Sequence, residues 1–193
     1  TISKSLASAD RIAKTLDMES SLVRSEETKK ENMPFVEFDH VSMKYNSNEE
    51  SLSNVNFVAN RGESIGVIGG TGSGKTTLIN LLAHLYDVSS GAIYIDGRNV
   101  TSISDEELHH IIGIVPQKAV LFKGTIRSNM CLRKEDASEE EILEALTVAQ
   151  AKDFVLKKEN GIDAVVEQEG KNFSGGQRQR LTIARALVGN PSI

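Results

Sequence analysis

Apolar residues recur along this chain with two periods, one helical and one strand-like. The first 18 residues carry apolar side chains three and four positions apart, which predicts an amphipathic helix unless the stripe packs on the domain itself. These residues are Ile2, Leu6, Ala9, Ala13 and Leu16. Residues 19–33 are polar and mixed in charge, and we interpret them as a linker. A folded domain is therefore predicted to begin near Pro34.

Strand signals dominate the region that follows the linker. The predicted strands are 35–45, 52–59, 65–68, 91–95 and 111–115. A polar turn at 46–50 joins the first two, and the apolar runs 65–68 and 111–115 are expected to be buried. Ser104, which precedes three acidic residues, predicts a capped short helix that continues through His110.

The second half of the domain is predicted to contain a helical lobe inserted between core strands. Residues 120–165 are mostly helical in character, and a capping box at Ser138 precedes an apolar stripe at helical spacing. We interpret the acidic face of this lobe as solvated surface. A further helix should start at Ser174 and stop near Gly189.

Composition and charge exclude several classes of protein. A chain of 193 residues can bury a sizeable core as one domain, and a net charge of −5 provides no basic surface, so we expect no nucleic-acid partner. The single cysteine, Cys131, cannot form an internal disulfide, which is typical of a reducing compartment. No apolar stretch approaches the roughly 18 residues of a membrane span, and no signal-peptide run is present.

A glycine-rich loop between predicted strand 65–68 and a predicted helix is the first candidate site. Its residues are Gly69, Gly70, Thr71, Gly72, Ser73, Gly74, Lys75, Thr76 and Thr77. Glycines allow positive φ and close approach to a ligand, so the loop N–H groups and the positive end of the helix can face phosphate oxygens. Lys75 suits the β- and γ-phosphates and the Thr76 hydroxyl suits Mg²⁺. In this context the pattern predicts a nucleotide site rather than a flexible turn.

A second glycine-rich helix start follows at residues 173–180. Ser174 is a good N-cap, but Gly175 and Gly176 in the first turn cost about 1 kcal/mol each relative to alanine. Two glycines are justified where an anion such as phosphate must approach the backbone closely. The alternative is an ordinary loop that enters a helix.

Tyr45 is a third candidate, because it ends the first predicted strand. An aromatic side chain at this place either packs on the sheet or stacks on a flat ring such as adenine, and its spacing alone favours packing.

Together these motifs resemble those of ATP-binding-cassette (ABC) ATPases, and more narrowly the nucleotide-binding domain of ABC exporters. The resemblance covers residues 34–193. The loop 69–77 matches the Walker A motif, and 173–177 matches the family signature, with Phe173 where Leu is commonest. The implied fold is α/β: a P-loop NTPase core with a mixed sheet and a β subdomain, plus an inserted helical subdomain at about 120–190, preceded by the N-terminal helix and linker.

The resemblance also implies roles for single residues. Val41 to Tyr45 is similar to the family's A-loop, so Tyr45 is expected to stack on adenine. Gln117 lies in a segment that resembles the Q-loop, where it would contact Mg²⁺ and the attacking water, so Lys75 and Gln117 are the expected catalytic residues and Thr76 and Gln117 the expected metal ligands. The signature residues would contact the ATP of a partner domain in a head-to-tail dimer; they are Ser174, Gly175, Gly176 and Gln177.

A wider assembly is implied by two further segments. Residues 166–170 resemble the loop with which exporters touch their membrane domains, and residues 1–18 resemble the cytosolic end of the last membrane helix. The expected parent is therefore a fused half-transporter at the cytoplasmic face of the cell membrane, which uses ATP and Mg²⁺, carries a membrane-spanning domain, and pairs with a second nucleotide-binding domain as a homo- or heterodimer.

The sequence stops at Ile193, where the family's Walker B strand would begin. The water-activating Glu is expected beyond it, and we expect the fragment alone not to hydrolyse ATP. The alternatives are a soluble ABC-type ATPase and a nucleotide-binding module with a degenerate catalytic centre. A small-molecule kinase with a phosphate loop is less favoured, because kinase chemistry does not require the second glycine-rich helix start.

Overall fold

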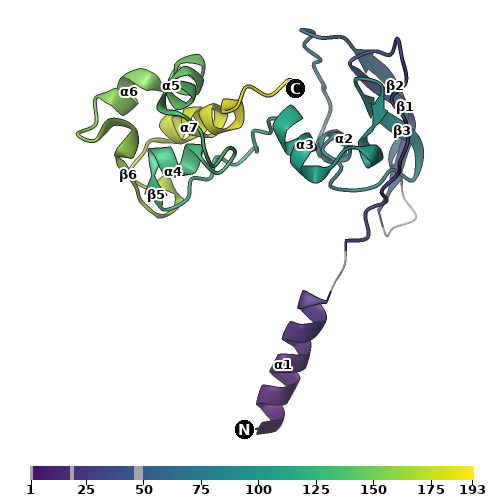
Figure 1. The fold of residues 1–193 in the computed structure, drawn as a ribbon, viewed down its shortest axis with the longest axis horizontal. Coiled ribbons are helices and arrows are strands. Elements are labelled where there is room, and N and C mark those ends of the chain that lie inside the picture. The colour runs from purple at the N-terminus through teal and green to yellow at the C-terminus, as the bar shows by residue number, and fades with distance from the viewer. Residues whose placement is uncertain (1, 18–19, 46–49) are drawn as a thin grey trace. The chain divides into compact units, whose positions relative to one another are not determined.

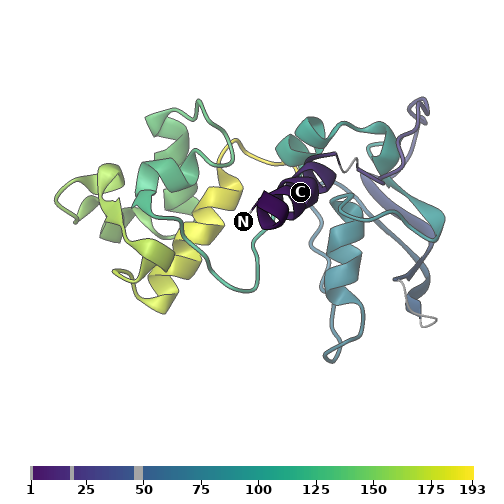
Figure 2. The same ribbon diagram turned by 90° about the horizontal axis from the view of Figure 1, so that it is seen from below.

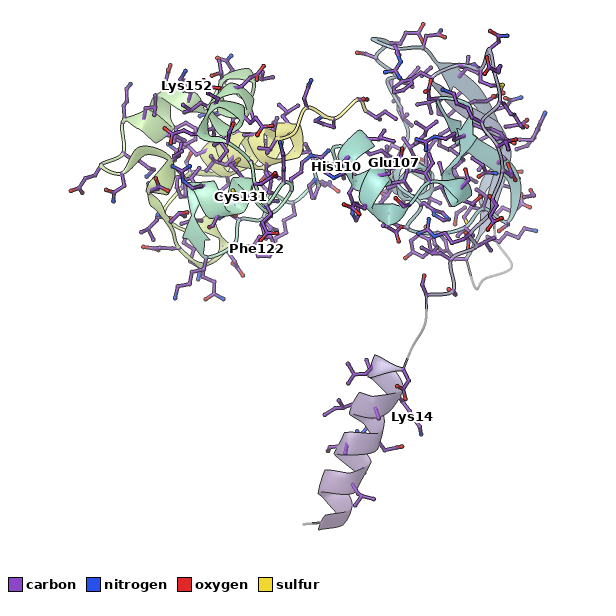
Figure 3. The ribbon with its side chains drawn as sticks, viewed as in Figure 1. Lys14, Glu107, His110, Phe122, Cys131 and Lys152 are labelled. Atoms are coloured by element: carbon purple, nitrogen blue, oxygen red, sulfur yellow. The ribbon has the colours of Figure 1, made fainter. Side chains whose placement is uncertain are left out.

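The computed structural model describes residues 2–17, 20–45 and 50–193, and the chain divides into two compact units that meet in sequence at Ile103 and Ser104. Helix α1 (Ile2–Leu16) forms as predicted. Its apolar side chains are exposed: Leu6 at 69%, Ile12 at 61% and Leu16 at 78%. Lys14 projects from the helix (Figure 3) and pairs with Asp10 at 3.0 Å. Among the described residues, no helix has both the length and the apolar character to cross a membrane.

The first unit contains a four-stranded antiparallel sheet (Figure 1). Its strands, in the spatial order β2-β1-β3-β4, are β2 (Glu50–Ala59), β1 (Val36–Lys44), β3 (Ser90–Ile95) and β4 (Arg98–Asn99). The predicted strands 35–45, 52–59 and 91–95 are thus confirmed. Of the turn predicted at 46–50, residues 46–49 lie outside the described residues and Glu50 begins β2. Alternate residues of β1 are buried, and Phe38 stacks on Phe57 with 4.6 Å between ring centroids.

Helix α2 (Lys75–Leu82) packs against β2 and buries Leu81 and Leu82 (Figure 1). The segment before it was predicted to be a buried strand, and this prediction is wrong. Residues 65–68 have no strand assignment, and Ile65, Val67 and Ile68 are 52%, 46% and 98% exposed. An apolar run becomes a strand only where a neighbour accepts its backbone hydrogen bonds. Among the described residues of this unit, no strand pairs with it.

The second unit is a helical lobe, as predicted, with one short β-ribbon that the sequence did not reveal. Its helices are α3 (Asp105–Ile111), α4 (Ile126–Met130), α5 (Glu139–Val148), α6 (Lys152–Leu156) and α7 (Gly175–Leu187), with 3₁₀ turns at Gly161–Asp163 and Gln168–Gly170. The ribbon pairs β5 (Gly124–Thr125) with β6 (Val165–Val166). Helix α7, yellow in Figure 2, packs against α5 and α4 around a buried core that includes Met130, Leu146 and Leu181.

The predicted helix caps are present. Ser104 accepts the N–H of Glu107, and Ser138 and Ser174 each form a reciprocal capping box. Helix α7 ends at Leu187, and Gly189 follows with a φ of +78°. Short polar signals therefore fixed the starts of three helices.

The predicted buried strand 111–115 is also wrong. Ile112 is buried, but Ile114 and Val115 are 42% and 44% exposed and have no strand assignment. Its first residues do have a neighbour: Ile193 donates to the Ile111 carbonyl at 3.0 Å and accepts from the Gly113 N–H at 2.7 Å. That exchange is the pattern of two parallel strands. The pairing covers too few residues to bury the apolar run.

The segment interpreted as a linker is tied to the first unit over residues 23–30, which we call the strap. The Val23 N–H bonds the Asp87 carboxylate at 3.0 Å, the Ser25 N–H bonds the Thr101 carbonyl at 3.1 Å, and the Lys30 N–H bonds the Gly97 carbonyl at 2.8 Å. Side chains add to these backbone bonds. Lys29 lies 2.7 Å from Asp96 and holds the pKa of that carboxyl below its usual value, and the Tyr94 hydroxyl raises the pKa of Lys30.

His84 anchors the strap from a buried position, 2% exposed, just after α2. Its Nδ1 lies 3.2 Å from Arg24 Nη1 and its Nε2 lies 3.1 Å from Asp87 Oδ1. A guanidinium only donates, so Nδ1 accepts and Nε2 carries the hydrogen bonded to Asp87. The turn after α2 therefore holds the strap through His84 and Asp87.

We expect Gly97→Ala to release the strap. Gly97 has a φ of +75°, and an added Cβ would collide with the Lys30 carbonyl. Gly62→Ala is the matched control, since Gly62 has a φ of +79° with nothing within 4 Å. The control should lose about 1–2 kcal/mol from left-handed strain alone, and Gly97→Ala should lose at least about 1 kcal/mol more from the clash. Denaturant unfolding measures both. Hydrogen exchange should also show faster exchange at residues 23–30 only in Gly97→Ala; equal behaviour of the two variants would contradict this account.

Candidate functional site

The loop of residues 69–74 has two positions, Gly72 and Gly74, where the backbone is in the left-handed region that favours glycine. Gly72 and Gly74 have φ values of +83° and +85°. A Cβ on Gly74 would lie 2.5 Å from the Ser51 carbonyl oxygen and 2.6 Å from the Leu52 Cδ2 of β2. Gly74 is therefore required both by its left-handed conformation and by the close packing of the loop on the sheet.

Gly74 is also the N-cap of α2, and this end of the helix has no side-chain cap. The helices that begin after Ser104, Ser138 and Ser174 each have a serine hydroxyl that accepts an N–H group of the first turn. At α2 the first N–H groups lack such an acceptor from the N-cap residue, and they carry the positive end of the helix dipole. An anion in the loop would supply the acceptor.

The Lys75 side chain folds back over this loop. Its Nζ donates to the carbonyl oxygens of Gly69 and Gly70, both at 2.6 Å, and to Ser73 Oγ at 3.1 Å. These bonds use all three donors of the ammonium group, and they lie at the protein surface. Phosphate oxygens can replace the loop oxygens as acceptors without leaving a buried, unpaired charge. Lys75 is therefore placed to transfer its hydrogen bonds from the loop to a bound phosphate.

Thr76 and Thr77 lie in the first turn of α2 and face different surroundings. Thr76 is exposed, whereas Thr77 is buried at 8%. An exposed hydroxyl beside a phosphate loop fits Mg²⁺, which retains several waters and binds mainly substrate phosphates with few protein ligands. Among the described residues, no group of three or more His, Cys, Asp or Glu side chains could hold a metal ion. The assignment of Thr76 as a ligand of Mg²⁺ remains a prediction.

Tyr45 contacts α2, the helix that follows the glycine-rich loop. Its hydroxyl donates to Thr77 Oγ1 at 3.3 Å, and its ring meets the Tyr86 ring edge-on with 5.2 Å between centroids and an interplanar angle of 89°. The sequence-predicted residues of the first unit are thus brought together around one helix. The contact with Tyr86 was not foreseen, because 40 residues without a shared motif separate the two rings in the sequence.

The second candidate site lies at the start of α7. Ser174 and Gln177 cap each other, with Ser174 N to Gln177 Oε1 at 3.0 Å and Gln177 N to Ser174 Oγ at 3.2 Å. A Cβ at Gly176 would meet nothing within 4 Å, and at Gly175 only the end of Arg178 at 4.0 Å. Packing within the described chain therefore does not require these two glycines. Phe173, 3% exposed, fills the core position before them.

Gln117 is exposed and belongs to the second unit, after the extended segment 112–116. No described contact of its side chain defines a role. Its assignment as a ligand of Mg²⁺ and of the attacking water remains a prediction.

Comparison with known proteins agrees with this geometry. A family model described as ABC transporter matches residues 52–193. An uncharacterized ABC transporter ATP-binding protein of Bacillus subtilis (strain 168), YfiB, is 46% identical over 189 residues, which are 97% of this chain and 33% of that protein. A putative multidrug export ATP-binding/permease protein of Staphylococcus aureus (strain NCTC 8325 / PS 47) is 42% identical over 82% of this chain and 28% of its own length.

A solved structure is similar as well. A bacterial Atm1-family ABC exporter with ATP bound superposes with a TM-score of 0.86 at 33% identity, covering 98% of this chain and 34% of that one. The chain therefore spans about a third of the length of the relatives it matches.

The chain belongs to the ABC transporter family. It is an α/β nucleotide-binding ATPase domain of the type found in ABC exporters.

Lys75→Met should abolish most of the affinity of the chain for inorganic triphosphate. The variant keeps the length of the side chain but loses charged hydrogen bonds, each worth about 1.5–3 kcal/mol, so the dissociation constant should rise roughly 10- to 150-fold for the loss of one. Lys29→Met removes an equal charge from the strap, away from the loop, and should bind as the wild type does. Calorimetric titration measures both; unchanged binding by Lys75→Met would rule out the loop as the phosphate site.

Proposed function

We propose that this chain binds MgATP with its phosphates in the loop 69–74 and its adenine on Tyr45. The observation that carries the proposal is the N-terminus of α2, where the N-cap residue Gly74 has no side chain to bond the first N–H groups. These N–H groups, the positive end of the helix dipole and the Lys75 ammonium all lie at the loop. Tyr45 bonds to Thr77 in the same helix, so α2 relates the phosphate end and the base end of the nucleotide. Thr76 holds Mg²⁺, which neutralises charge on the β- and γ-phosphates. The role of Gln117, in the second unit, stays a prediction from the family resemblance.

We further propose that two such domains pair head to tail, with the start of α7 facing the ATP of the partner. Gly175 and Gly176 weaken the helix start, and a Cβ would meet nothing within 4 Å at Gly176 and only the end of Arg178 at Gly175. A phosphate group of a second domain's nucleotide fits this backbone opening at a helix N-terminus. Hydrolysis then consists mainly of positioning water and stabilising charge around the γ-phosphate.

The complete protein is proposed to be an exporter at the cytoplasmic face of the cell membrane. The Staphylococcus aureus relative is named as a multidrug export ATP-binding/permease protein, and its extra length accommodates a permease part. Helix α1 supports this context, since its exposed apolar side chains at Leu6, Ile12 and Leu16 have the character of a helix that continues toward a membrane domain. The division into a membrane-helix end at 1–18, a linker at 19–33 and the ATPase domain at 34–193 is part of the same proposal.

ATP hydrolysis by the full-length parent protein, measured with and without its membrane domain, tests the proposal. Purified parent protein in lipid vesicles should hydrolyse ATP, and Lys75→Met in the same protein should not. Hydrolysis that needs no membrane domain would favour the soluble ABC-type ATPase instead. ATP binding without hydrolysis would indicate a degenerate catalytic centre.

Tyr45→Ala should weaken ATP binding by about 1–3 kcal/mol, by analogy with bases that stack on aromatic side chains. Affinity for inorganic triphosphate should not change, because triphosphate has no base. Tyr45→Phe keeps the ring and should retain most of the ATP affinity. Calorimetric titration with both ligands separates the two ends of the nucleotide; an equal loss for ATP and triphosphate would mean that Tyr45 supports the loop instead of stacking on adenine.

Ser174→Arg should leave ATP binding by the single chain intact but stop dimer closure and turnover in the full-length protein. A long cation at this helix start obstructs the surface that faces the partner's nucleotide. Ser138→Arg is the matched control, because Ser138 forms the same capping box on α5 and its loss costs about 1 kcal/mol of stability. Turnover should survive in the control. If Ser174→Arg abolished ATP binding by the single chain, the cross-domain role would be wrong.

A further inference from the structure

Tyr86 has an aromatic contact that the packing of the first unit does not require. The residue is 44% exposed, so it adds little to the core. Its ring nevertheless meets Tyr45 edge-on at 5.2 Å, a geometry that the charge distribution of aromatic rings favours. Because the rings are perpendicular, Tyr86 does not stack face to face on Tyr45, which is itself only partly buried.

Tyr86 is itself held in place by the turn after α2. The His84 N–H bonds the Leu81 carbonyl at 3.0 Å, and the Leu85 N–H bonds the Asn80 carbonyl at 2.9 Å. The buried His84 bonds Asp87 across the turn at 3.1 Å, and Asp87 in turn accepts the Val23 N–H of the strap. The backbone on both sides of Tyr86 is thus held, so less conformational freedom remains to be lost when its ring contacts a neighbouring ring.

Tyr45 is therefore held at two points that both belong to α2 or to the turn that follows it. Thr77 accepts its hydroxyl at 3.3 Å, and Tyr86 meets its ring. We propose that Tyr86 is a positioning residue for nucleotide binding, which holds the Tyr45 ring in its adenine-stacking orientation before the nucleotide arrives. This inference rests on the proposed function, because it assumes that Tyr45 stacks on the base. A ring that is already oriented loses less freedom on binding, so the base binds more tightly.

A double-mutant cycle tests the proposal on the full chain, with ATP and inorganic triphosphate as the two probes. Tyr86→Leu removes the ring contact and retains apolar volume. An edge-to-face pair of this strength predicts a rise in the ATP dissociation constant of about 2- to 12-fold, with no change for triphosphate. Tyr86→Phe restores the ring and should restore the affinity. Leu85→Ala, a neighbour of similar exposure, should have no effect.

The second arm of the cycle separates positioning from a general structural role. In a Tyr45→Ala background, Tyr86→Leu should cause no additional loss of ATP affinity, because the ring that it orients is absent. The ring resonances of Tyr45, one of three tyrosines, should shift in ligand-free Tyr86→Leu and not in Leu85→Ala.

Three outcomes overturn the inference. They are an unchanged ATP affinity in Tyr86→Leu while Tyr45→Ala is weakened, a loss that persists in the Tyr45→Ala background, and an equal loss for triphosphate. A fourth outcome, an unchanged ATP affinity in the Tyr45→Ala single variant, overturns the adenine-stacking part of the proposed function together with the inference. This outcome is distinguishable from the other three because the variant carries no change at Tyr86.

Discussion

The packing of Gly74 against β2 is the constraint on which the rest of the first unit depends. A residue without a Cβ lets the chain turn from the loop into α2 in direct contact with Ser51 and Leu52. The same residue leaves the helix without a side-chain cap, so its N–H groups have no acceptor from the N-cap residue. Serine caps three other helices, whereas α2 and the short α6 (Lys152–Leu156) have no side-chain cap; at α2 the glycine-rich loop and Lys75 lie beside the uncapped N–H groups, which is what an anion site requires.

Helix α2 then organises more than the phosphate loop. Its first turn holds Tyr45 through Thr77, and the turn after it holds Tyr45 through Tyr86 and the strap through His84 and Asp87. A short helix of eight residues thus has the phosphate loop at one end and the anchor of the segment that follows α1 at the other. The proposed base site, the proposed phosphate site and the strap are therefore all held by the same helix and the turn that follows it.

Sequence patterns predicted the local structure well and the pairing of strands poorly. Serine caps, the glycine loop and the strand 35–45 depend on nearby residues, so they could be placed from the sequence alone. The runs 65–68 and 111–115 could not, because their burial depends on a neighbouring strand and not on their own composition. The contacts of Tyr86 and of the strap were missed for a similar reason. They join polar and aromatic side chains that are far apart in the sequence, and no sequence motif marks such pairs. The residues of the two candidate sites were found before the structure, because glycine-rich helix starts are local patterns, and the family resemblance then gave them individual roles.

The exposed run before the loop has a consequence for ligand affinity. On its helix side the loop is fixed by α2 and β2, but on its other side residues 65–68 have no strand partner among the described residues of the unit. A segment that pairs with residues 65–68 would fix this side of the loop too, and fixing backbone in advance spares a ligand about 1–2 kcal/mol for each residue that it would otherwise have to order. Such a segment would therefore tighten ligand binding in the loop without touching the ligand.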